Sequence, residues 1–343
     1  MLKVCGIHYD VGTTTLDGGT TRPSLSEETM EREIGDIGTG LHANAVRVTG
    51  GDVERIRIAA RIAVRTGLEP WLTPLLPNAD AATTLRAVGA VAGVGQELLE
   101  AGHRCTLIVG CELSVFMRGI LPGATHGERF GLLVDPARLA AEVGASALDP
   151  RAEFAAFLRA AASTARTHFA GPVAYASGLW EDVDWSLFDM VGLDAYRDAN
   201  NRGTYAATLQ HQAVGRRVVV TETGCATYRG AAAAGGMAWT AVERRHEPWR
   251  LRPGVVRDEA EQAGELGELL DLAEQSGADG VFIYTYVAPS YPSSANPETD
   301  LDAASYALVR SWPDGRTEPK LAYGCISERY RAATTRALHS RSR

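Results

Sequence analysis

The segment CTLIVGCEL, residues 105–113, decides the fold. It is a short and almost continuous apolar run, which is typical of a strand buried on both faces of a parallel sheet. Glu112 follows the run, so a carboxylate lies where the buried strand comes to the surface. The segment therefore indicates a parallel α/β fold with a charged group at the carboxyl end of a strand.

Similar runs recur on both sides of this segment, with helical patterns between them, and this alternation predicts βαβ units. The further runs are KVCGIHY (3–9), ANAVRVT (43–49), EPWLTPL (69–75), PVAYAS (172–177), DMVGLDAY (189–196), RVVVTET (217–223) and GVFIYTY (280–286). Helices are expected to start at Ser26, at Asp52 and at Asp149 with Pro150 in the first turn, and to cover 79–101, 202–214, 258–276 and 319–335.

Eight such strands, with no linker rich in Pro, Gly or Ser to divide the chain, favour a single (β/α)8 TIM barrel over an open doubly wound sheet. No GxGxxG or GxxxxGK[ST] motif follows any of the strands, so we expect no nucleotide cofactor and no other cofactor. The predicted catalytic domain covers residues 1–335, and residues 336–343 are expected to form a basic, disordered tail.

Two connections are longer than the rest, at about 113–149 after the fourth strand and about 223–257 after the seventh. In a barrel both rise from the carboxyl-terminal face, where such loops shape the substrate cleft. They contain GILPGATHGERFG and YRGAAAAGGMAW, whose compositions differ from those of helices. We interpret the two connections as cleft walls or lids.

Composition and charge exclude several classes of protein. The net charge of −8 gives no general attraction to nucleic acid, and no apolar stretch approaches the ~20 residues that a membrane span needs. The five cysteines show no CxxC or Cys/His spacing, and the first strand begins too early for a signal peptide, so a cytoplasmic location is expected. The scattered histidines 103, 126, 168 and 211 do not predict a metal site.

Two glutamates are the strongest candidates for chemistry. Glu112 and Glu222 each end an apolar strand, and a carboxylate in that position is costly unless it is paired or used. Retaining glycosidases need two carboxyl groups about 5 to 5.5 Å apart, one as acid/base and one as nucleophile. The structural alternative is a buried ion pair that closes the top of the barrel, with Arg47 as the cation.

Other candidates are weaker. His8 and Asp10 close the first strand, where a histidine could bind a substrate hydroxyl, although a turn-capping aspartate would explain the pattern almost as well. Asp194 is a candidate to point inward, with the phase of its strand left open. Trp180, Trp185 and Trp239 could stack on a sugar face or simply pack.

The motifs VGCELS around Glu112, VVVTETG around Glu222, NAVRV and DMVGLDAY resemble the large clan of (β/α)8 retaining glycoside hydrolases. The resemblance implies Glu112 as acid/base and Glu222 as nucleophile. It also implies Arg47 as a positive group near the nucleophile and Tyr196 as a hydroxyl donor to it. A small molecule or oligosaccharide is the substrate that this clan suggests; the sequence does not indicate an oligomeric state.

The sequence departs from the clan at two places. Cys111 stands where the clan has an asparagine that binds the sugar 2-hydroxyl, and Tyr284 and Tyr286 stand near the end of strand eight, where the clan has a tryptophan platform. Because a thiol is a weak hydrogen-bond partner, the 2-hydroxyl is read differently or the substrate is not an ordinary pyranoside.

A second resemblance covers the carboxyl-terminal half. The segments TETGCATYRGAAAAGGMAW, RDEAEQAGEL and DLDAASYALVRSW resemble actinobacterial proteins labelled abortive infection proteins. That resemblance suggests that this chain belongs to a subgroup with its own substrate pocket, marked by Cys225, Tyr228, Arg229, Trp239, Arg257, Asp258 and Glu259.

Three hypotheses follow from the sequence. The first is a retaining glycosidase or transglycosidase. The second is a tailoring enzyme that uses the two carboxylates for proton transfer or cyclisation on a natural product. The third is a sugar or protein binder without catalytic activity, linked to phage defence.

Overall fold

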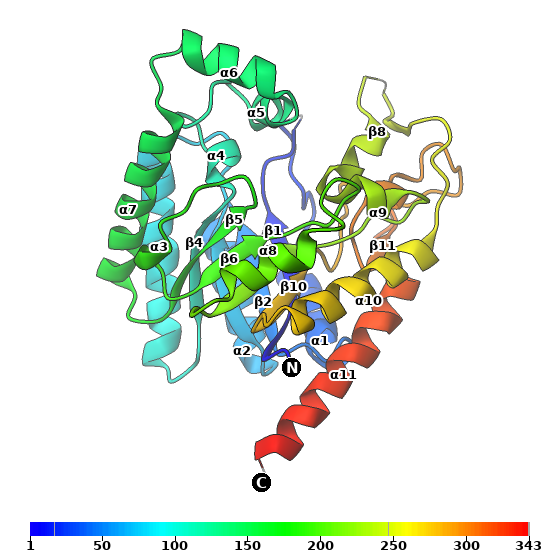
Figure 1. The fold of residues 1–343 in the computed structure, drawn as a ribbon. Helices are drawn as coiled ribbons and strands as arrows, with labels where there is room; N and C mark the ends of the chain where they lie inside the picture. Colours follow the sequence, from blue (N-terminus) through cyan, green and yellow to red (C-terminus); the bar gives the residue numbers. More distant parts are fainter. Residues whose placement is uncertain (17, 246, 342–343) are drawn as a thin grey trace.

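The computed structural model describes residues 1–16, 18–245 and 247–341, with the side chains of the last helix described as far as Arg336. Parallel strands form a closed barrel in the order β1-β10-β7-β6-β5-β4-β3-β2 (Figure 1). Their bounds are β1 (Val4–Gly12), β2 (Ala45–Gly50), β3 (Glu69–Pro74), β4 (Thr106–Cys111), β5 (Val173–Gly178), β6 (Val191–Asp194), β7 (Val218–Thr223) and β10 (Gly280–Ile283). The predicted (β/α)8 barrel and its strands are confirmed.

Helices surround the barrel, and the expected starts at Ser26, Asp52 and Asp149 are confirmed. Each of these side chains accepts a hydrogen bond from a backbone N–H of the first helical turn, which satisfies a donor that the helix itself leaves free. The outer helices are α1 (Glu27–Thr39), α2 (Val53–Arg65), α3 (Ala81–Glu100), α7 (Pro150–His168), α8 (Tyr205–Gln212), α10 (Glu259–Gln275) and α11 (Leu321–Arg341). A 3-10 turn, η1 (Trp185–Leu187), joins β5 to β6.

Helix α11 runs along α10 and away from the barrel (Figure 1). Its backbone is helical through Arg341, so most of the segment expected as a tail continues this helix. Residues 342 and 343 lie outside the described residues, and the domain boundary near 335 stays a prediction. Among the described helices, none is both long and apolar enough to cross a membrane.

The core has two layers. Inside the barrel, the Trp71 and Phe282 rings pack against each other at an interplanar angle of 55°, with their centroids 4.9 Å apart, and help to fill the lumen. Gly6 is required there, since a Cβ at this position would lie 2.2 Å from the Phe282 ring. A larger apolar cluster lies between the strands and the outer helices. The packed lumen leaves the carboxyl-terminal face of the barrel as the open end.

Both long connections rise above this face, but their expected non-helical character was wrong. The first contains α4 (Leu113–Phe116), α5 (His126–Leu133) and α6 (Pro136–Ala145), and α5 begins in the GATHGERFG segment because Thr125 caps it. The second contains α9 (Ala231–Ala234), η2 (Gly235–Ala241) and the short hairpin of β8 (Val242–Glu243) and β9 (Arg250–Leu251). They stand on opposite sides of the barrel mouth (Figure 1).

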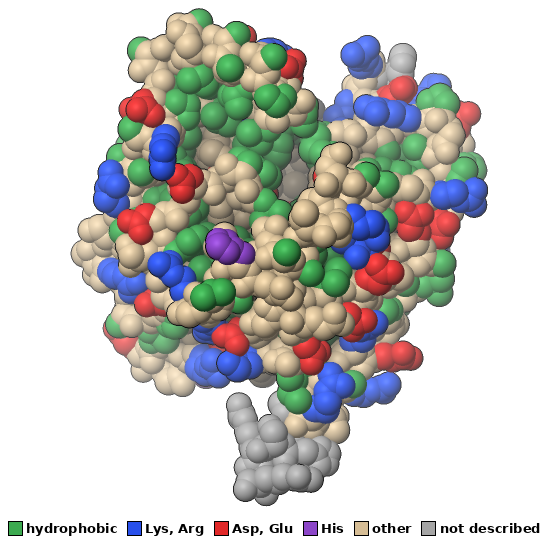
Figure 2. Space-filling model, in the orientation of Figure 1, with side chains coloured by type: hydrophobic (Ala, Val, Ile, Leu, Met, Phe, Trp, Pro, Cys, Tyr) green, Lys and Arg blue, Asp and Glu red, His purple; other side chains and the backbone are tan. Residues whose placement is uncertain are grey.

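A third connection, which follows β10, was not singled out in the sequence. It holds η3 (Leu301–Ala304) and the hairpin of β11 (Val309–Ser311) and β12 (Thr317–Pro319) before the chain enters α11. Side chains from all three connections line one cavity of about 440 Å³ above the barrel. The molecule is hollowed between the lobe of α5 and α6 and the lobe of β8 (Figure 2).

Candidate active site

Glu112 and Glu222 both line this cavity. Glu112 directly follows β4 and adopts a left-handed backbone conformation with φ 44° and ψ 45°. Glu222 lies near the end of β7, with its side chain 14% exposed. The carboxyl ends of two non-adjacent strands thus bring the predicted carboxylates to one cleft.

The strained backbone of Glu112 is held by groups from the neighbouring strand. The N–H of Leu113 donates to the hydroxyl of Tyr175 at 2.8 Å, and the N–H of Ser114 donates to Glu181 at 3.0 Å. The Tyr175 hydroxyl donates in turn to Glu181 at 2.9 Å. A left-handed conformation is unfavourable for a residue other than glycine, so it persists where surrounding contacts fix it. Tyr175 and Glu181 provide those contacts.

Glu222 has one partner for each carboxylate oxygen. The Tyr196 hydroxyl donates to Oε1 at 2.8 Å, and the Arg47 guanidinium donates to Oε2 at 3.2 Å. Arg47 is fully buried, and its Nη1 also donates to the backbone carbonyl of Thr221. The two partners fix the orientation of the carboxylate and favour its ionised form. This is the arrangement that the glycosidase resemblance implied for Arg47 and Tyr196.

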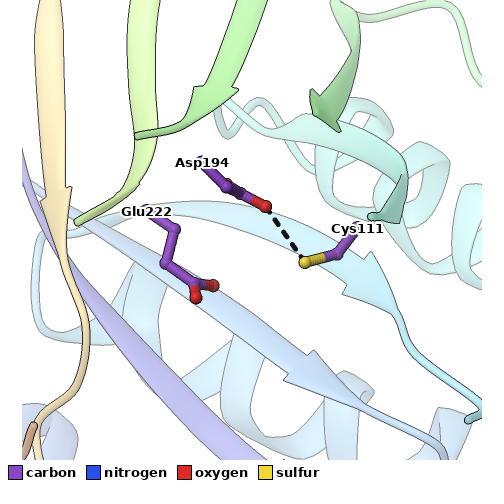
Figure 3. A group of neighbouring side chains, drawn as sticks. All are labelled: Cys111, Asp194 and Glu222. Atoms are coloured by element: carbon purple, nitrogen blue, oxygen red, sulfur yellow. Dashed lines mark hydrogen bonds between the residues drawn. The ribbon is translucent and has the colours of Figure 1, made fainter. Parts of the chain in front are cut away.

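Asp194, at the end of β6, is a third carboxylate beside the pair. It accepts from Thr221 Oγ1 at 2.8 Å, from Arg47 at 3.3 Å and from the Cys111 thiol at 3.1 Å. Figure 3 shows Cys111 and Asp194 facing each other beside Glu222. The inward orientation that was left open for Asp194 is the one observed. The single donor of Cys111, its thiol S–H, is therefore already bonded to the Asp194 carboxylate.

The two glutamates differ in acidity for identifiable reasons. Burial raises the pKa of Glu112 well above its ordinary range, and the negative charges of Asp194, Glu222 and Glu181 raise it further. Burial and Asp194 raise the pKa of Glu222 to about 7, but Arg47 and the Tyr196 hydrogen bond oppose that rise. The protonated form is thus favoured at Glu112 more strongly than at Glu222. Two carboxyls with separated pKa values suit the roles of acid and nucleophile.

Cys111, Asp194 and Glu222 offer one sulfur and two oxygen atoms within 4.8 Å of one another, a spacing that could hold a metal ion. Arg47 already supplies a permanent positive charge to both carboxylates. Burial and the charge of Asp194 also raise the pKa of the Cys111 thiol well above its ordinary value, whereas a metal would need the thiolate. This donor set therefore suits an internal hydrogen-bond network better than a metal centre.

Five more of the expected residues line the cavity: His8, Asp10, Trp180, Trp239 and Tyr284. The His8 ring lies 4.7 Å from the Tyr284 ring between centroids, and its Nδ1 is 3.3 Å from Thr285 Oγ1. Burial lowers the pKa of His8 well below its ordinary value, so the ring is held neutral. Asp10 accepts from the N–H of Gly12, as a turn-capping aspartate does.

Four uncharged candidates, besides the buried Arg47, do not line the cavity: Trp185, which packs edge-on against Phe188, and three residues with the following contacts. Tyr286 follows the end of β10, and its hydroxyl donates to Asp36 of α1 at 2.9 Å, away from the barrel mouth. Cys225 is buried in the core behind β7, where burial raises the pKa of its thiol far above the ordinary value. Tyr228 donates to the carbonyl of Ala238 and braces the second connection. Packing accounts for all three.

The charged residues of the second resemblance do not line the cavity and form a network of ion pairs and hydrogen bonds. Arg257 pairs with Asp300 and Asp302, and Asp302 also pairs with the buried Lys320 at 2.9 Å. Asp258 caps α10, and Glu259 accepts from the N–H of Leu321 at the start of α11. The exposed Arg229 pairs weakly with Asp258. These contacts fasten the connection after β10 to α10 and α11.

Sequence reasoning missed several residues at the site. Glu181 was invisible because it lies in a short turn after β5, with no strand pattern around it. Tyr306 lines the cavity and contacts the Tyr196 ring at 5.7 Å, but its segment had been noted only for its resemblance. Arg244, Trp249 and Tyr291 also line the cavity. Their positions follow from the two hairpin-bearing connections, which no local pattern predicts.

The fold is similar to that of solved glycoside hydrolases. A complex of a GH113 β-1,4-mannanase matches with a TM-score of 0.60 and 13% identity over 96% of this chain and 99% of that chain. The GH113 β-mannanase AaManA from Alicyclobacillus acidocaldarius matches with a TM-score of 0.61 and 15% identity over 97% of this chain and 98% of that chain. A GH2 β-galacturonidase from Eisenbergiella tayi matches with a TM-score of 0.54 and 14% identity over 96% of this chain and 51% of that chain.

No protein-family model matches the chain, and no curated protein sequence matches it either. At these identities the similarity establishes the fold alone, a single (β/α)8 barrel. Nothing in these comparisons bears on the resemblance to abortive infection proteins.

Proposed function

We propose that the chain is a retaining glycosidase or transglycosidase in which Glu222 is the nucleophile and Glu112 is the acid/base. The observation that carries the proposal is the pair of hydrogen bonds to Glu222, from Tyr196 at 2.8 Å and from Arg47 at 3.2 Å. They orient the carboxylate and favour its ionised form, while Glu112 in the same cavity makes no ion pair with a described residue, and burial favours its protonated form.

The reaction would take two steps. In the first, an oxygen of Glu222 attacks the anomeric carbon as the glycosidic bond breaks, and Glu112 gives its proton to the leaving oxygen. In the second, Glu112 takes a proton from an incoming water, and that oxygen displaces Glu222 from the anomeric carbon. An alcohol or amine in place of water would make the same enzyme a transglycosidase.

The cavity suits a small glycoside or an oligosaccharide. Its volume of about 440 Å³ falls in the range of small-molecule sites, roughly 300 to 1,000 Å³. Trp180, Phe130 and Trp239 present apolar faces to it, and Trp180 is 46% exposed, so its ring is free to stack on a sugar. Asp198 and Asn201 add polar groups to the lining.

A second candidate, proton transfer or cyclisation on a natural product, is favoured by one observation. Asp194 and Cys111 are joined to each other at 3.1 Å, in the part of the site where the clan binds the sugar 2-hydroxyl. Together with the two glutamates they give three carboxyl groups around one cavity. Such a site can move protons without forming a bond to Glu222.

Intact mass spectrometry after incubation with a panel of 2-fluoro glycosyl fluorides tests the proposal. A retaining enzyme is expected to gain the mass of one 2-fluoroglycosyl group, which peptide mapping assigns to Glu222. The variant Glu222→Gln is the negative control, since an amide does not form the ester. An adduct would also identify the sugar.

The absence of an adduct across a broad panel, with the protein shown to be folded, would count against the retaining mechanism. Loss of any measured turnover in both Glu112→Gln and Glu222→Gln, without an adduct in the parent, would then favour the proton-transfer candidate. A binding role would be favoured if both variants kept every measured phenotype.

A further inference from the structure

Arg244 lies at the rim of the cavity in an aromatic surround. Its guanidinium carbon is 5.2 Å from the ring centroid of Trp239, 5.2 Å from that of Trp249 and 5.8 Å from that of Tyr291. It also donates a hydrogen bond to the Tyr291 hydroxyl. All four residues line the cavity, and we call them the Arg244 cradle.

The cradle is built from three separate segments. Trp239 comes from η2, Arg244 and Trp249 come from the turn of the β8–β9 hairpin, and Tyr291 comes from the connection after β10. The ladder pairs Val242 with Leu251, which places the two arms of the hairpin side by side below the cradle. Cation–π attraction to the rings holds the guanidinium in one position. The Arg244 side chain therefore loses less conformational entropy when a ligand binds.

Arg244 has no ion-pair partner among the described residues. Other buried or half-buried arginines have protein partners: Arg47, Arg197 and Arg257 pair with carboxylates. Arg129 donates to backbone carbonyls and to Asn78. Within the described part of the chain, the printed contacts of Arg244 are with aromatic rings, and its side chain lines the cavity. A guanidinium carries five N–H donors, and the one acceptor found for them among the described residues is a neutral phenol. Donors are therefore left for a ligand.

The charge around the cradle is opposite to that of the cavity floor. Among the residues that line the described part of the cavity, Arg244 is the single arginine or lysine, whereas the acidic residues are Asp10, Glu112, Asp194, Asp198 and Glu222. The hairpin segment RRHEPWRLR, residues 244–252, has four arginines against one glutamate in a chain of net charge −8. Figure 2 shows Lys and Arg side chains gathered on the rim above β8.

We propose that the Arg244 cradle binds an anionic group, a carboxylate, phosphate or sulfate, carried by the part of the substrate that is distant from the reacting bond. The carboxylates of the floor repel an anion from the reaction centre, so the charged group is recognised at the rim. Guanidinium groups bind such anions through parallel N–H donors. The proposal rests on the glycosidase function above and narrows its substrate to acidic glycosides.

Anion binding can be measured without any turnover. The probe is the set of ¹⁵N-labelled tryptophan indole signals, with those of Trp239 and Trp249 assigned through their phenylalanine variants. Glucuronate, inorganic phosphate and sulfate are titrated separately, at an ionic strength held constant with chloride. At least one of them is expected to shift both signals in a saturable way, and the anion that does so distinguishes carboxylate from phosphate and sulfate recognition.

Matched variants identify the group responsible. Arg244→Gln is expected to lower the affinity for that anion about tenfold to a hundredfold, because charge-assisted hydrogen bonds are lost. Arg245→Gln removes the same charge from the next, exposed position and should leave the affinity within about twofold, because it does not line the cavity. Arg244→Lys keeps the charge and should retain part of the binding, which guards against misfolding of the glutamine variant.

The proposal is overturned if no probe shifts the two indole signals, or if Arg245→Gln loses as much affinity as Arg244→Gln. The glycosidase proposal fails separately, by the absence of a Glu222 adduct. A competition experiment with a trisaccharide then links the anion site to the glycosidase site. β-1,4-Trimannuronate should displace the small anion from the parent protein, and Arg244→Gln should weaken trimannuronate binding. If labelling identifies a sugar other than mannose, the acidic trisaccharide of that sugar replaces trimannuronate.

Discussion

The hydroxyl of Tyr196 donates to Glu222 Oε1 at 2.8 Å, so a side chain that follows β6 holds a carboxylate on β7. This contact lowers the pKa of Glu222 against the upward effect of burial and of Asp194. The hydroxyl of Tyr306, whose ring packs on that of Tyr196, donates instead to the carbonyl of Gly235. The two tyrosines are thus close in space and different in role.

Tyr196→Phe is expected to slow formation of the Glu222 adduct about tenfold at neutral pH, the effect of one lost hydrogen bond to a charged group. Because the pKa of Glu222 rises when this donor is removed, the acidic limb of the rate against pH should move to higher pH. Tyr306→Phe is the control and should leave that limb in place. Equal effects of the two substitutions would indicate general loosening of the site instead.

A second prediction concerns Glu181, which holds the backbone after Glu112. Its own pKa is raised to about 7 by burial, and its negative charge raises the pKa of Glu112. Glu181→Gln removes that charge, so the pKa of Glu112 should fall. The basic limb of the pH profile of turnover is therefore expected to move to lower pH. The measurement is turnover on the sugar that labelling identifies, across the pH range.

Asp182→Asn is the matched control for Glu181→Gln, since Asp182 is exposed and pairs with Arg151 on the surface. It should leave the profile unchanged. A uniform loss of activity in Glu181→Gln with no displacement of the basic limb would mean that Glu181 only supports the backbone.

The strands of the barrel were predictable from sequence because each is buried on both faces. CTLIVGCEL and RVVVTET contain few polar residues, so the position where each strand ends was clear, and Glu112 and Glu222 were found there. The same reasoning failed for Tyr286. β10 ends at Ile283, and beyond that point alternation no longer determines which way a side chain faces.

Residues of the walls were harder to predict because their positions depend on contacts between distant segments. Arg244, Trp249 and Tyr291 come together through a two-residue ladder and a 3-10 turn, neither of which has a periodic signature. The sequence showed the motifs of the second resemblance, but it did not predict the ion-pair network that their charged residues form. Lys320 lies far along the chain from Arg257, and a single buried aspartate, Asp302, joins them.

That network gives a third prediction. Asp302→Ala leaves the buried Lys320 without its carboxylate partner and removes one of the acidic partners of the half-buried Arg257, which should lower the free energy of unfolding by about 3 to 5 kcal/mol. The measurement is urea unfolding followed by far-ultraviolet circular dichroism. Labelling of Glu222 per folded molecule should be unchanged, since Asp302 does not line the cavity.

The control is Asp314→Ala, which removes an exposed carboxylate that pairs with Arg316 and should leave the free energy of unfolding nearly unchanged. Unchanged stability of Asp302→Ala together with lost labelling would contradict the structural role. It would return these residues to the substrate pocket that the sequence resemblance suggested.

The last prediction connects the acidity of Glu222 to folding. Its pKa rises from an ordinary 4.5 to about 7 in the folded chain, so between these values the folded state binds more protons than the unfolded state. Stability then falls as pH rises through this window, and the loss is complete above about 7. Glu222 is thus expected to destabilise the protein in its ionised form.

Glu222→Gln mimics the protonated side chain and should remove this loss. The gain in free energy of unfolding of the variant over the parent is expected to be near zero below pH 4.5 and to grow to roughly 3 kcal/mol above pH 7. The size follows because a tenfold change in an acidity constant is worth about 1.4 kcal/mol. Urea unfolding at a series of pH values measures the difference. Glu142→Gln, at an exposed position of α6, should show no such growth. A variant less stable than the parent at high pH would mean that Arg47 and Tyr196 outweigh burial, and that the charged form of Glu222 is the one the fold prefers.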